Sequence, residues 1–269
     1  MKKIITLTTD FGVTDEYAGI MRGVIHSLCP QVTVIDITHG IRRHDIRQAA
    51  YLIYSTHRFF NAGTIHVIVV DPDVGTKRRI VLLQAQEQYF LAPDNGILSL
   101  FLLKNLLTAC YIVDCPDLYL KPVSHNFHGR DIMAPIAAHL ADGMPVHQIG
   151  QKIDYDTLTV LALPKPAIDR GRRIITGAVV DFDHFGNLIT NIHLDDFRQI
   201  HPSPTDHRQF NLTVKNTVIS GISESYAAVP AGSRLALFGS RDFLEIAVNQ
   251  GSALLNLGIE LNDPVILQP

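Results

Sequence analysis

A short run of β-branched residues that ends in an acidic residue constrains the fold of this chain more than any other feature. The segment Val67–Val70 is apolar throughout, which predicts a strand that is buried on both faces of a parallel sheet. Pro72 ends the strand and favours an extended backbone at Asp71. The Asp71 carboxylate is therefore expected at the carboxyl end of a buried strand, where open α/β sheets bind their ligands.

Arg78 follows Asp71 by seven residues, and the intervening Gly75 allows a turn that would bring the two side chains together. One interpretation is a functional pair in which the guanidinium holds the carboxylate beside a ligand. The other is an ion pair that only fixes the loop. The spacing alone leaves both interpretations open, so the assignment depends on other parts of the chain.

The segments around this strand alternate between helical and extended patterns. Apolar positions recur with helical spacing after Asp15 and after Asp45, and β-branched runs stand between them. The expected strands and helices alternate over Ile4–Thr9, Asp15–Leu28, Val32–Ile37, Ile46–Thr56 and Ile65–Val70. Such a βαβ pattern predicts an α/β domain with a central parallel-type sheet and helices on its faces.

The composition changes near Leu163, and the change predicts a domain boundary. Prolines and basic residues over 164–171 are typical of a linker between a domain of residues 1–163 and a domain of residues 172–269. The strands expected beyond it are short and are separated by turn residues, over Ile174–Val180, Leu188–Ile192, Phe210–Val214, Arg234–Phe238, Leu244–Val248 and Val265–Leu267. Helices largely disappear, so this half is expected to be an all-β domain, either barrel-like or a sandwich.

The composition also excludes several classes of function. With 46% hydrophobic and 18% charged residues the chain is typical of a globular protein, and its net charge of −3 does not favour the binding of nucleic acid. No apolar run approaches the length of a membrane span, and none resembles the core of a signal peptide. The cysteines, Cys29, Cys110 and Cys115, are too few for a disulfide framework, which predicts reduced thiols and a cytoplasmic location.

Three further groups of residues could carry chemistry. Asp10 follows the first strand, where carboxylates bind ribose hydroxyls in nucleotide folds, whereas Asp15 nearby could simply cap a helix. His128 stands at the expected start of a helix that continues over Ile132–Leu140, where backbone N–H groups favour anions. In the β-rich half, the segment Asp183–Asn187 forms either a ligand-binding loop or an ordinary hairpin turn.

The motifs of other site classes are missing from the sequence. The chain has neither a P-loop nor a G-x-G-x-x-G pattern after the first strand, and it has no G-x-S-x-G nucleophile elbow. Several aspartates and His128 could converge on a metal ion, but the ligand spacing of known metal sites is missing, and Arg78 would supply positive charge instead. We therefore expect neither a metal nor a cofactor; a metallohydrolase is the alternative that metal analysis would test.

Taken together, the motifs make the chain similar to a known family. The shared segments are Thr9–Gly12 with Asp15, Tyr17 and Gly19; Val70–Pro72 with Gly75, Thr76 and Arg78; Pro93–Gly96; Phe127–Asp131; Phe185–Leu188 with Thr190 and Asn191; and Gly239–Ser240 with Glu245–Asn249. In this order they resemble the S-adenosyl-L-methionine (SAM) hydroxide adenosyltransferases. These adenosine-forming SAM hydrolases are relatives of the SAM-dependent chlorinase and fluorinase, and the resemblance runs nearly from end to end.

The resemblance implies an N-terminal αβα sandwich, a C-terminal β-barrel and a homotrimer. Each site would lie between the N-terminal domain of one subunit and the C-terminal domain of its neighbour. It further implies that Asp71, Arg78 and His128 are catalytic. The residues implied to bind the substrate are Asp10 for the ribose, Asp183 and Asn187 for the methionine amine, Ser240 and Arg241 for its carboxylate, Val248 and Gln250 for the adenine, and Phe185 for packing against the ligand.

The implied reaction is hydrolysis of SAM to adenosine and L-methionine by in-line attack of water or hydroxide on C5′, with SAM as the substrate and no cofactor. One alternative is a SAM-dependent halogenase. The halogenases carry a tyrosine where this chain has Asp71, and a tyrosine and a serine where it has His128 and Gly129, which argues against that alternative. Another is a non-catalytic protein that binds SAM or adenosine. Asp73 departs from the family pattern and would alter the site only if its carboxylate faced it.

Overall fold

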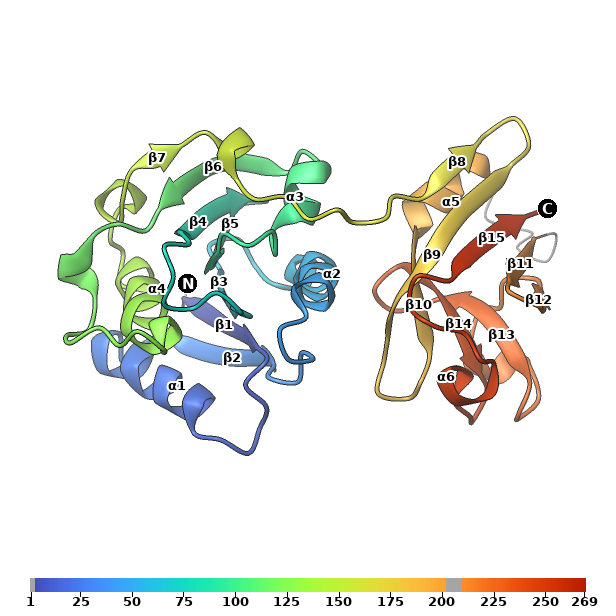
Figure 1. Ribbon diagram of the computed structural model, residues 1–269, viewed down its shortest axis with the longest axis horizontal. Helices are drawn as coiled ribbons and strands as arrows, with labels where there is room; N and C mark the ends of the chain where they lie inside the picture. Colours follow the sequence, from blue (N-terminus) through green and yellow to red (C-terminus); the bar gives the residue numbers. More distant parts are fainter. Residues whose placement is uncertain (1–2, 202–209) are drawn as a thin grey trace. The chain divides into compact units, whose positions relative to one another are not determined.

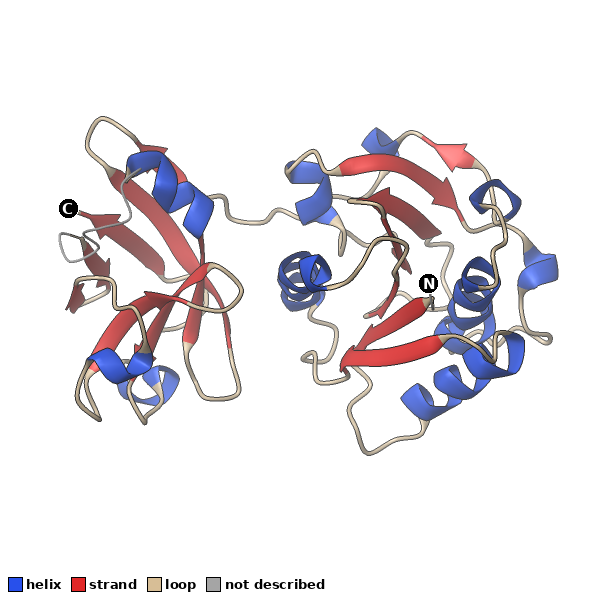
Figure 2. Ribbon diagram, turned by 180° about the vertical axis from the view of Figure 1, so that it is seen from behind, coloured by secondary structure: helices blue, strands red, loops and turns tan. Residues whose placement is uncertain are grey.

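The computed structural model describes residues 3–201 and 210–269, and the chain divides into two compact units, Met1–Ala162 and Leu163–Pro269 (Figure 1). Helices flank the sheet of the first unit, whereas strands dominate the second (Figure 2). The predicted fold class, an α/β domain followed by a barrel-like all-β domain, is confirmed. None of the helices in the described part of the chain is long and apolar enough to span a bilayer.

The sheet of the N-terminal unit is mixed, with the strand order β2-β1-β3-β5-β4-β6-β7. The pairs β2–β1, β1–β3 and β3–β5 are parallel, as the βαβ pattern predicts, whereas β4, β6 and β7 join in antiparallel pairs. The strands are β1 Ile4–Thr9, β2 Thr33–Thr38, β3 Ile65–Val69, β4 Ile80–Ala85, β5 Gln88–Pro93, β6 Leu107–Ile112 and β7 Lys152–Ile153. Strands β4 and β5 form a hairpin-like antiparallel pair.

Strand β3 lies between two apolar cores, one on each face of the sheet. Val67 and Val69 pack in one core with residues of helices α1 (Tyr17–Leu28) and α4 (Ala134–Ala141). Ile68 and Val70 pack in the other with residues of α2 (Ile46–Thr56) and α3 (Ser99–Leu103). Because successive side chains of a strand point to opposite faces, a strand with two buried faces must be apolar throughout, as this one is.

The strands of the C-terminal unit pair antiparallel in the order β12-β11-β15-β9-β10-β14-β13, with β8 beside β9. The end strands β12 and β13 contact each other, so the sheet curls into a nearly closed, barrel-like form around an apolar core. The strands are β8 Ala167–Asp169, β9 Ile174–Phe182, β10 Leu188–His193, β11 Asn211–Val214, β12 Thr217–Ser220, β13 Arg234–Phe238, β14 Phe243–Val248 and β15 Pro264–Gln268.

Some elements of the C-terminal unit differ from the sequence expectation. Strand β8 lies within residues 164–171, the segment expected to be a linker, and it pairs with β9. Helix α5 (Leu194–Ile200) was not expected; it begins at His193, whose side chain accepts a hydrogen bond from the Asp195 amide. A second short helix, α6, spans Ala253–Asn256 and is capped by Ser252. Both helices are short, and their capping residues are their main local signal.

Candidate active site

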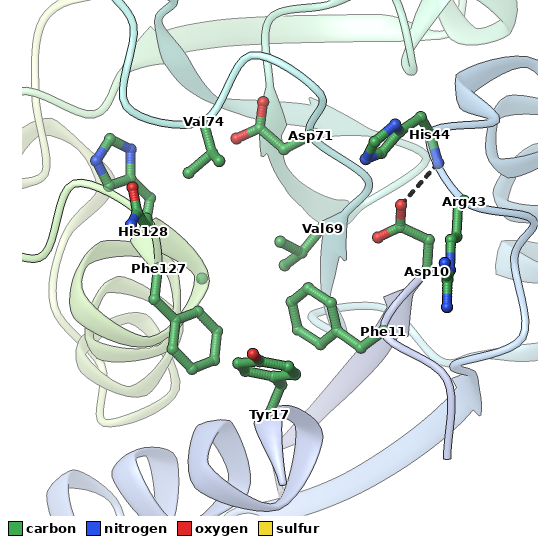
Figure 3. Close-up of a pocket in the computed structure, with 12 residues that line it drawn as sticks. Asp10, Phe11, Tyr17, Arg43, His44, Val69, Asp71, Val74, Phe127 and His128 are labelled. Carbon is green, nitrogen blue, oxygen red and sulfur yellow. Dashed lines mark hydrogen bonds between the residues drawn. The ribbon is translucent and has the colours of Figure 1, made fainter. Parts of the chain in front are cut away.

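A cavity of about 290 Å³ opens in the N-terminal unit at the carboxyl ends of β1 and β3. The two strands pair in parallel with Thr9 opposite Val69, so Asp10 and Asp71 follow them at the same edge of the sheet. Figure 3 shows both carboxylates beside this space. The described residues that line it are Asp10, Phe11, Tyr17, Arg43, His44, Val69, Asp71, Val74, Asn126, Phe127, His128 and Gly129.

Asp71, Arg78 and His128 form one hydrogen-bonded cluster. Arg78 Nε donates to both carboxylate oxygens of Asp71, at 3.0 and 2.7 Å, and Nη2 makes a further bond to Oδ2. Nη2 also lies 2.8 Å from Nδ1 of His128. The side chains of Arg78 and Asp71 are only 8% and 5% exposed, and Arg78 is not among the described residues that line the cavity. The guanidinium therefore lies behind the two groups that face a ligand.

The contact with Arg78 determines the protonation state of His128. An arginine can only donate, so Nδ1 of His128 is an acceptor, and the proton of the neutral ring is on Nε2. Burial lowers the pKa of His128 below its ordinary value of 6.5, and the charge of Arg78 lowers it further, whereas Asp71 and Asp131 oppose the shift. The imidazole is therefore neutral at neutral pH.

The loop between Asp71 and Arg78 is held at both ends and in its middle. Asn95 Nδ2 donates to the Val70 carbonyl at 2.9 Å, directly before Asp71. Asp94 accepts from the side chain of Arg79, and its amide donates to the Arg79 carbonyl at 2.9 Å. Gly75 has a φ of +83°, and a Cβ there would lie 2.6 Å from the His125 carbonyl oxygen. Only glycine permits this approach, which brings the loop against the segment that carries His128.

His128 begins a single helical stretch that continues as a π-helix over Gly129–Met133 and then as α4. A Cβ on Gly129 would lie 3.2 Å from Met21 Sδ and 3.3 Å from Val69 Cγ1, so the glycine allows this helix to start close to β3 and α1. Asp131, which is buried, accepts from the Ser124 amide at 2.8 Å and from the Arg130 side chain. These contacts fix the helix start and, with it, the position of the imidazole.

Asp10 lies in a turn that is joined to the segment after β2. Its Oδ2 accepts from the His44 amide at 2.8 Å, and His44 has a positive φ of 62°. Thr9 Oγ1 bonds His39 Nδ1 at 2.8 Å, and the His39 carbonyl accepts from the Gly12 amide at 2.8 Å. Asp45 caps α2 nearby, because its side chain accepts a hydrogen bond from the Gln48 amide. The Asp10 carboxylate is thus held rigidly at the cavity.

Apart from Arg43 and His44, the rest of the wall is aromatic or uncharged. The rings of Phe11, Tyr17 and Phe127 contact one another with centroids 5.3 to 5.8 Å apart, and in Figure 3 they gather across the cavity from Asp71. Asn126 lines the cavity. Asp73 is exposed and is not among the described lining residues, so the additional carboxylate does not face this space.

The remaining predicted ligand-binding residues lie in the C-terminal unit. Asp183 Oδ1 accepts from the amides of Phe185 and Asn187, both at 2.9 Å, and Oδ2 accepts from the Asn187 side chain. Phe185 is 74% exposed. The hairpin between β9 and β10 is therefore an ordinary turn by its backbone, but it displays an apolar ring to solvent, which a turn does not require.

The other predicted residues of this unit lie at the β13–β14 turn and after β14. Ser240 and Arg241 belong to the turn, in which the Asp242 amide donates to the Gly239 carbonyl. Val248 ends β14 and forms a bridge with Gly251, and Gln250 between them has a φ of +56°. The structure thus places Asp10, Asp71, Arg78 and His128 together in one unit, and the other predicted residues within the other.

Two polar residues near these turns were missed by the sequence analysis as site residues. Tyr226 donates to Glu245 Oε2 at 2.8 Å, and Glu245 is a buried residue of β14. A single glutamate in the otherwise apolar segment Phe243–Val248 is the signal that could have identified it. Tyr226 lies outside every recognised motif and carried no such signal.

Within residues 3–201 and 210–269, no group of three or more histidine, cysteine, aspartate or glutamate side chains could hold a metal ion.

Comparisons with known proteins cover the whole chain. Residues 5–150 match the SAM hydroxide adenosyltransferase N-terminal domain, and residues 177–266 match the corresponding C-terminal domain. The chain is 32% identical to the (R)-S-adenosyl-L-methionine hydrolase of Thermus thermophilus, over 96% of this chain and 97% of that protein. It is 30% identical to a fluorinase of an Actinoplanes species, over 73% of this chain and 74% of that protein.

Solved structures agree with these matches. The crystal structure of an uncharacterised conserved protein from Thermotoga maritima aligns with a TM-score of 0.89 and 31% identity, and it covers 100% of both chains. Matches to both domain families, and relatives of more than 30% identity over nearly the full length, lead to one conclusion. The chain belongs to the SAM hydroxide adenosyltransferase family.

Proposed function

We propose that this protein hydrolyses SAM to adenosine and L-methionine. Relatives that match over nearly the full length are named (R)-S-adenosyl-L-methionine hydrolase, which supports the substrate and the reaction. The observation that carries the proposal is the cluster of Asp71, Arg78 and His128 at the cavity that also receives Asp10. A carboxylate and a neutral imidazole beside a nucleoside-sized cavity suit the delivery of a water molecule.

The chemistry requires little from the protein except a positioned nucleophile. In SAM the sulfonium is bonded to C5′, and the sulfur departs as a neutral thioether. The water oxygen forms a bond to C5′ as the C5′–S bond breaks, and the electron pair of that bond stays on sulfur. One proton of the water passes to the Asp71 carboxylate. Holding the water in line with the C5′–S bond lowers the barrier by roughly 7–11 kcal/mol in well-oriented reactions.

Each of the three residues has a distinct part in this proposal. Asp71 accepts the proton, and His128 holds the water or passes the proton onward, because its neutral ring keeps one N–H and stands at the start of a helix. Arg78 acts through the other two, since it lies behind them and contacts both. It is therefore a positioning residue that holds the Asp71 carboxylate and the His128 ring in place.

We further propose that Asp10 binds the ribose hydroxyls, and that the C-terminal residues bind the rest of SAM. Asp183 and Asn187 would hold the amine, Ser240 and Arg241 the carboxylate, and the backbone near Val248 and Gln250 the adenine, with Phe185 packed against the ligand. A homotrimer, in which a neighbouring copy supplies these groups, is part of the proposal. The free cysteines fit a cytoplasmic location. No cofactor is needed, because the sulfonium is already an activated leaving group.

The deciding experiment is incubation of the protein with SAM in ¹⁸O-labelled water, with and without chloride and with and without a chelator. We expect ¹⁸O in the 5′-hydroxyl of adenosine, independent of both additions. Formation of 5′-chloro-5′-deoxyadenosine would identify a halogenase, and unchanged SAM bound at one equivalent per chain would identify a binding protein. Loss of activity with the chelator would identify a metallohydrolase.

A further inference from the structure

The turn that carries Asp10 is held from behind by His39, a buried residue that is not among the described residues of the cavity wall. Nδ1 of His39 lies 2.8 Å from Oγ1 of Thr9, the residue directly before Asp10. The same oxygen accepts from the Phe11 amide at 3.2 Å. The His39 carbonyl accepts from the Gly12 amide at 2.8 Å. His39 therefore contacts the chain on both sides of Asp10, once through its ring and once through its backbone.

The directions of these hydrogen bonds follow from the groups around the ring. Nε2 of His39 makes no directed hydrogen bond within the described residues, but it lies 3.3 Å from Oδ1 of Asp36. A carboxylate attracts a proton and can only accept, so the proton of the neutral ring is on Nε2, and Nδ1 is an acceptor. The hydroxyl proton of Thr9 then points to Nδ1, while its oxygen accepts from the Phe11 amide.

An irregularity in the pairing of β1 with β2 lies beside this turn. Leu7 pairs with Asp36, whereas Thr8 pairs with Thr38, so one residue of β2 is passed over just before β1 ends. Such bulges change the direction of the side chains that follow them and are common next to active sites. His39 is the first residue after β2, so its ring follows the bulge directly.

The order threonine, histidine, aspartate is also that of a nucleophile with its base and an orienting acid. Thr9 is fully buried, however, and neither Thr9 nor His39 belongs to the described cavity wall. A substrate in the cavity does not reach this hydroxyl. The arrangement therefore suits the support of a neighbouring group, which here is the carboxylate that follows Thr9 in the chain.

We infer that His39 is a positioning residue that, through Thr9, holds the Asp10 carboxylate in the geometry that accepts hydrogen bonds from two ribose hydroxyls. This inference rests on the proposed function, in which Asp10 binds the ribose. A carboxylate accepts from both hydroxyls only while its position is fixed, so a looser turn loses the benefit of at least one of them. The consequence is a loss of selectivity for ribose with little change in the affinity for the adenine part.

The test compares adenosine with 2′,3′-dideoxyadenosine, which lacks both hydroxyls, by calorimetric titration. The wild type should bind adenosine ~100-fold more tightly, about tenfold for each hydrogen bond to a charged group. His39→Leu fills the space but cannot accept from Thr9, so it should reduce this ratio by about tenfold. His39→Asn leaves more empty space but keeps an acceptor oxygen, and it should retain most of the ratio. A role in packing alone predicts the opposite order of the two variants.

Two threonines of β1 provide matched variants. Thr9→Val keeps the shape of the side chain, removes the hydroxyl and should reproduce the effect of His39→Leu. Thr6→Val removes an equivalent buried bond, because Thr6 Oγ1 lies 2.8 Å from Nδ1 of His66. This second bond is remote from the Asp10 turn, so its loss should lower the unfolding temperature and leave the ratio of the two affinities unchanged.

The inference is overturned if His39→Leu and Thr9→Val keep the wild-type ratio, or if Thr6→Val reduces the ratio as much as they do. Equal binding of the two nucleosides by the wild type would also overturn it, because Asp10 would then not distinguish the ribose. The proposed function is decided separately, by the formation of ¹⁸O-labelled adenosine from SAM, so either conclusion can fail without the other.

Discussion

The two polar clusters of this molecule, one in each domain, differ in their charge balance. In the N-terminal cluster the Arg78 guanidinium contacts both Asp71 and His128, so the carboxylate is paired before any ligand arrives. In the C-terminal cluster the hydrogen bonds that described residues give to Asp183 and Glu245 come from neutral donors: backbone amides, the Asn187 amide and a phenol. The first cluster suits a water molecule, and the second keeps negative charge for a cation.

The sharpest way to test this difference is to neutralise one carboxylate in each cluster. Asp71→Asn should lower kcat by ~10³-fold with little change in the Kd for SAM, because a general base is lost but its shape is kept. Asp183→Asn should raise the Kd for SAM and leave kcat nearly unchanged, because only an attraction to a bound cation is lost. Steady-state kinetics and calorimetry measure both. If the two variants changed kcat and Kd in the same way, the two clusters would not differ in their roles.

Asp73 offers a matched control for the first of these variants. It is an aspartate two residues from Asp71, but it is exposed and does not belong to the described cavity wall. Asp73→Asn should therefore keep the kcat and KM of the wild type. A large loss of activity in this variant would mean that the charge of the whole loop, and not the position of Asp71, supports the reaction.

The next effect concerns His128 and the acid side of the pH profile. The variant His128→Asn keeps a side-chain oxygen within reach of Arg78, but an amide does not titrate. It should lower kcat by ~10²-fold, far more than it weakens SAM binding. In the wild type, burial and Arg78 lower the pKa of His128, so activity should fall only at a pH below 6.5, where the ring gains a proton and repels the guanidinium. Equal losses of kcat and affinity, or an acid limb that persists in the variant, would contradict this role.

If the two clusters meet only between neighbouring subunits, defects in different subunits should complement each other. Asp71→Asn and Asp183→Ala chains, co-expressed at equal amounts, should give about one quarter of wild-type activity at low SAM, because about one site in four combines two intact halves. Each variant alone should stay nearly inactive under the same conditions. No recovery in the mixture, with mixed oligomers verified by tag purification, would place both halves of a site in one chain.

The smallest expected effect is on stability, and it has opposite signs in the two domains. Burial lowers the pKa of His66 to about 4, so the folded N-terminal domain loses stability as the pH falls from 6.5 towards that value, by ~3 kcal/mol at most. Burial raises the pKa of Glu245 above 4.5, so over its titration the C-terminal domain gains stability as the pH falls. Scanning calorimetry at several pH values measures the unfolding transition of each domain in the wild type and in His66→Gln. The transition of the N-terminal domain should depend less on pH in the variant.

The fold and the contact between Asp71 and Arg78 could be predicted because their signals are local. The apolar run of β3 followed by Asp71 and Pro72 identifies a buried strand and its polar end, and Gly75 in the turn that follows permits the contact with Arg78. Asp45 before an amphipathic segment predicts the start of α2 correctly. These features depend on residues within a few positions of one another, which is the range over which periodicity and capping are informative.

The features that could not be predicted depend on long-range packing. The position of Arg78 behind Asp71 and His128 depends on how a helix 50 residues later is placed against the loop. The bond between Tyr226 and Glu245 joins a short 3₁₀ turn to a strand, and neither the phenol nor the turn has a distinctive pattern. The antiparallel pairing of β6 with β4 and β7 depends on strand order, which alternation within one strand does not reveal.

The clamped ends of the loop after β3 have a consequence for the energetics of catalysis. Asn95 holds the Val70 carbonyl and Asp94 holds Arg79, so the entropy of closing the loop is lost during folding and not during ligand binding. The amides of this loop should accordingly resist hydrogen exchange equally well with and without nucleoside. Since Asp94 and Asn95 do not line the cavity, substitutions there would act by loosening the loop that carries Asp71 and Arg78.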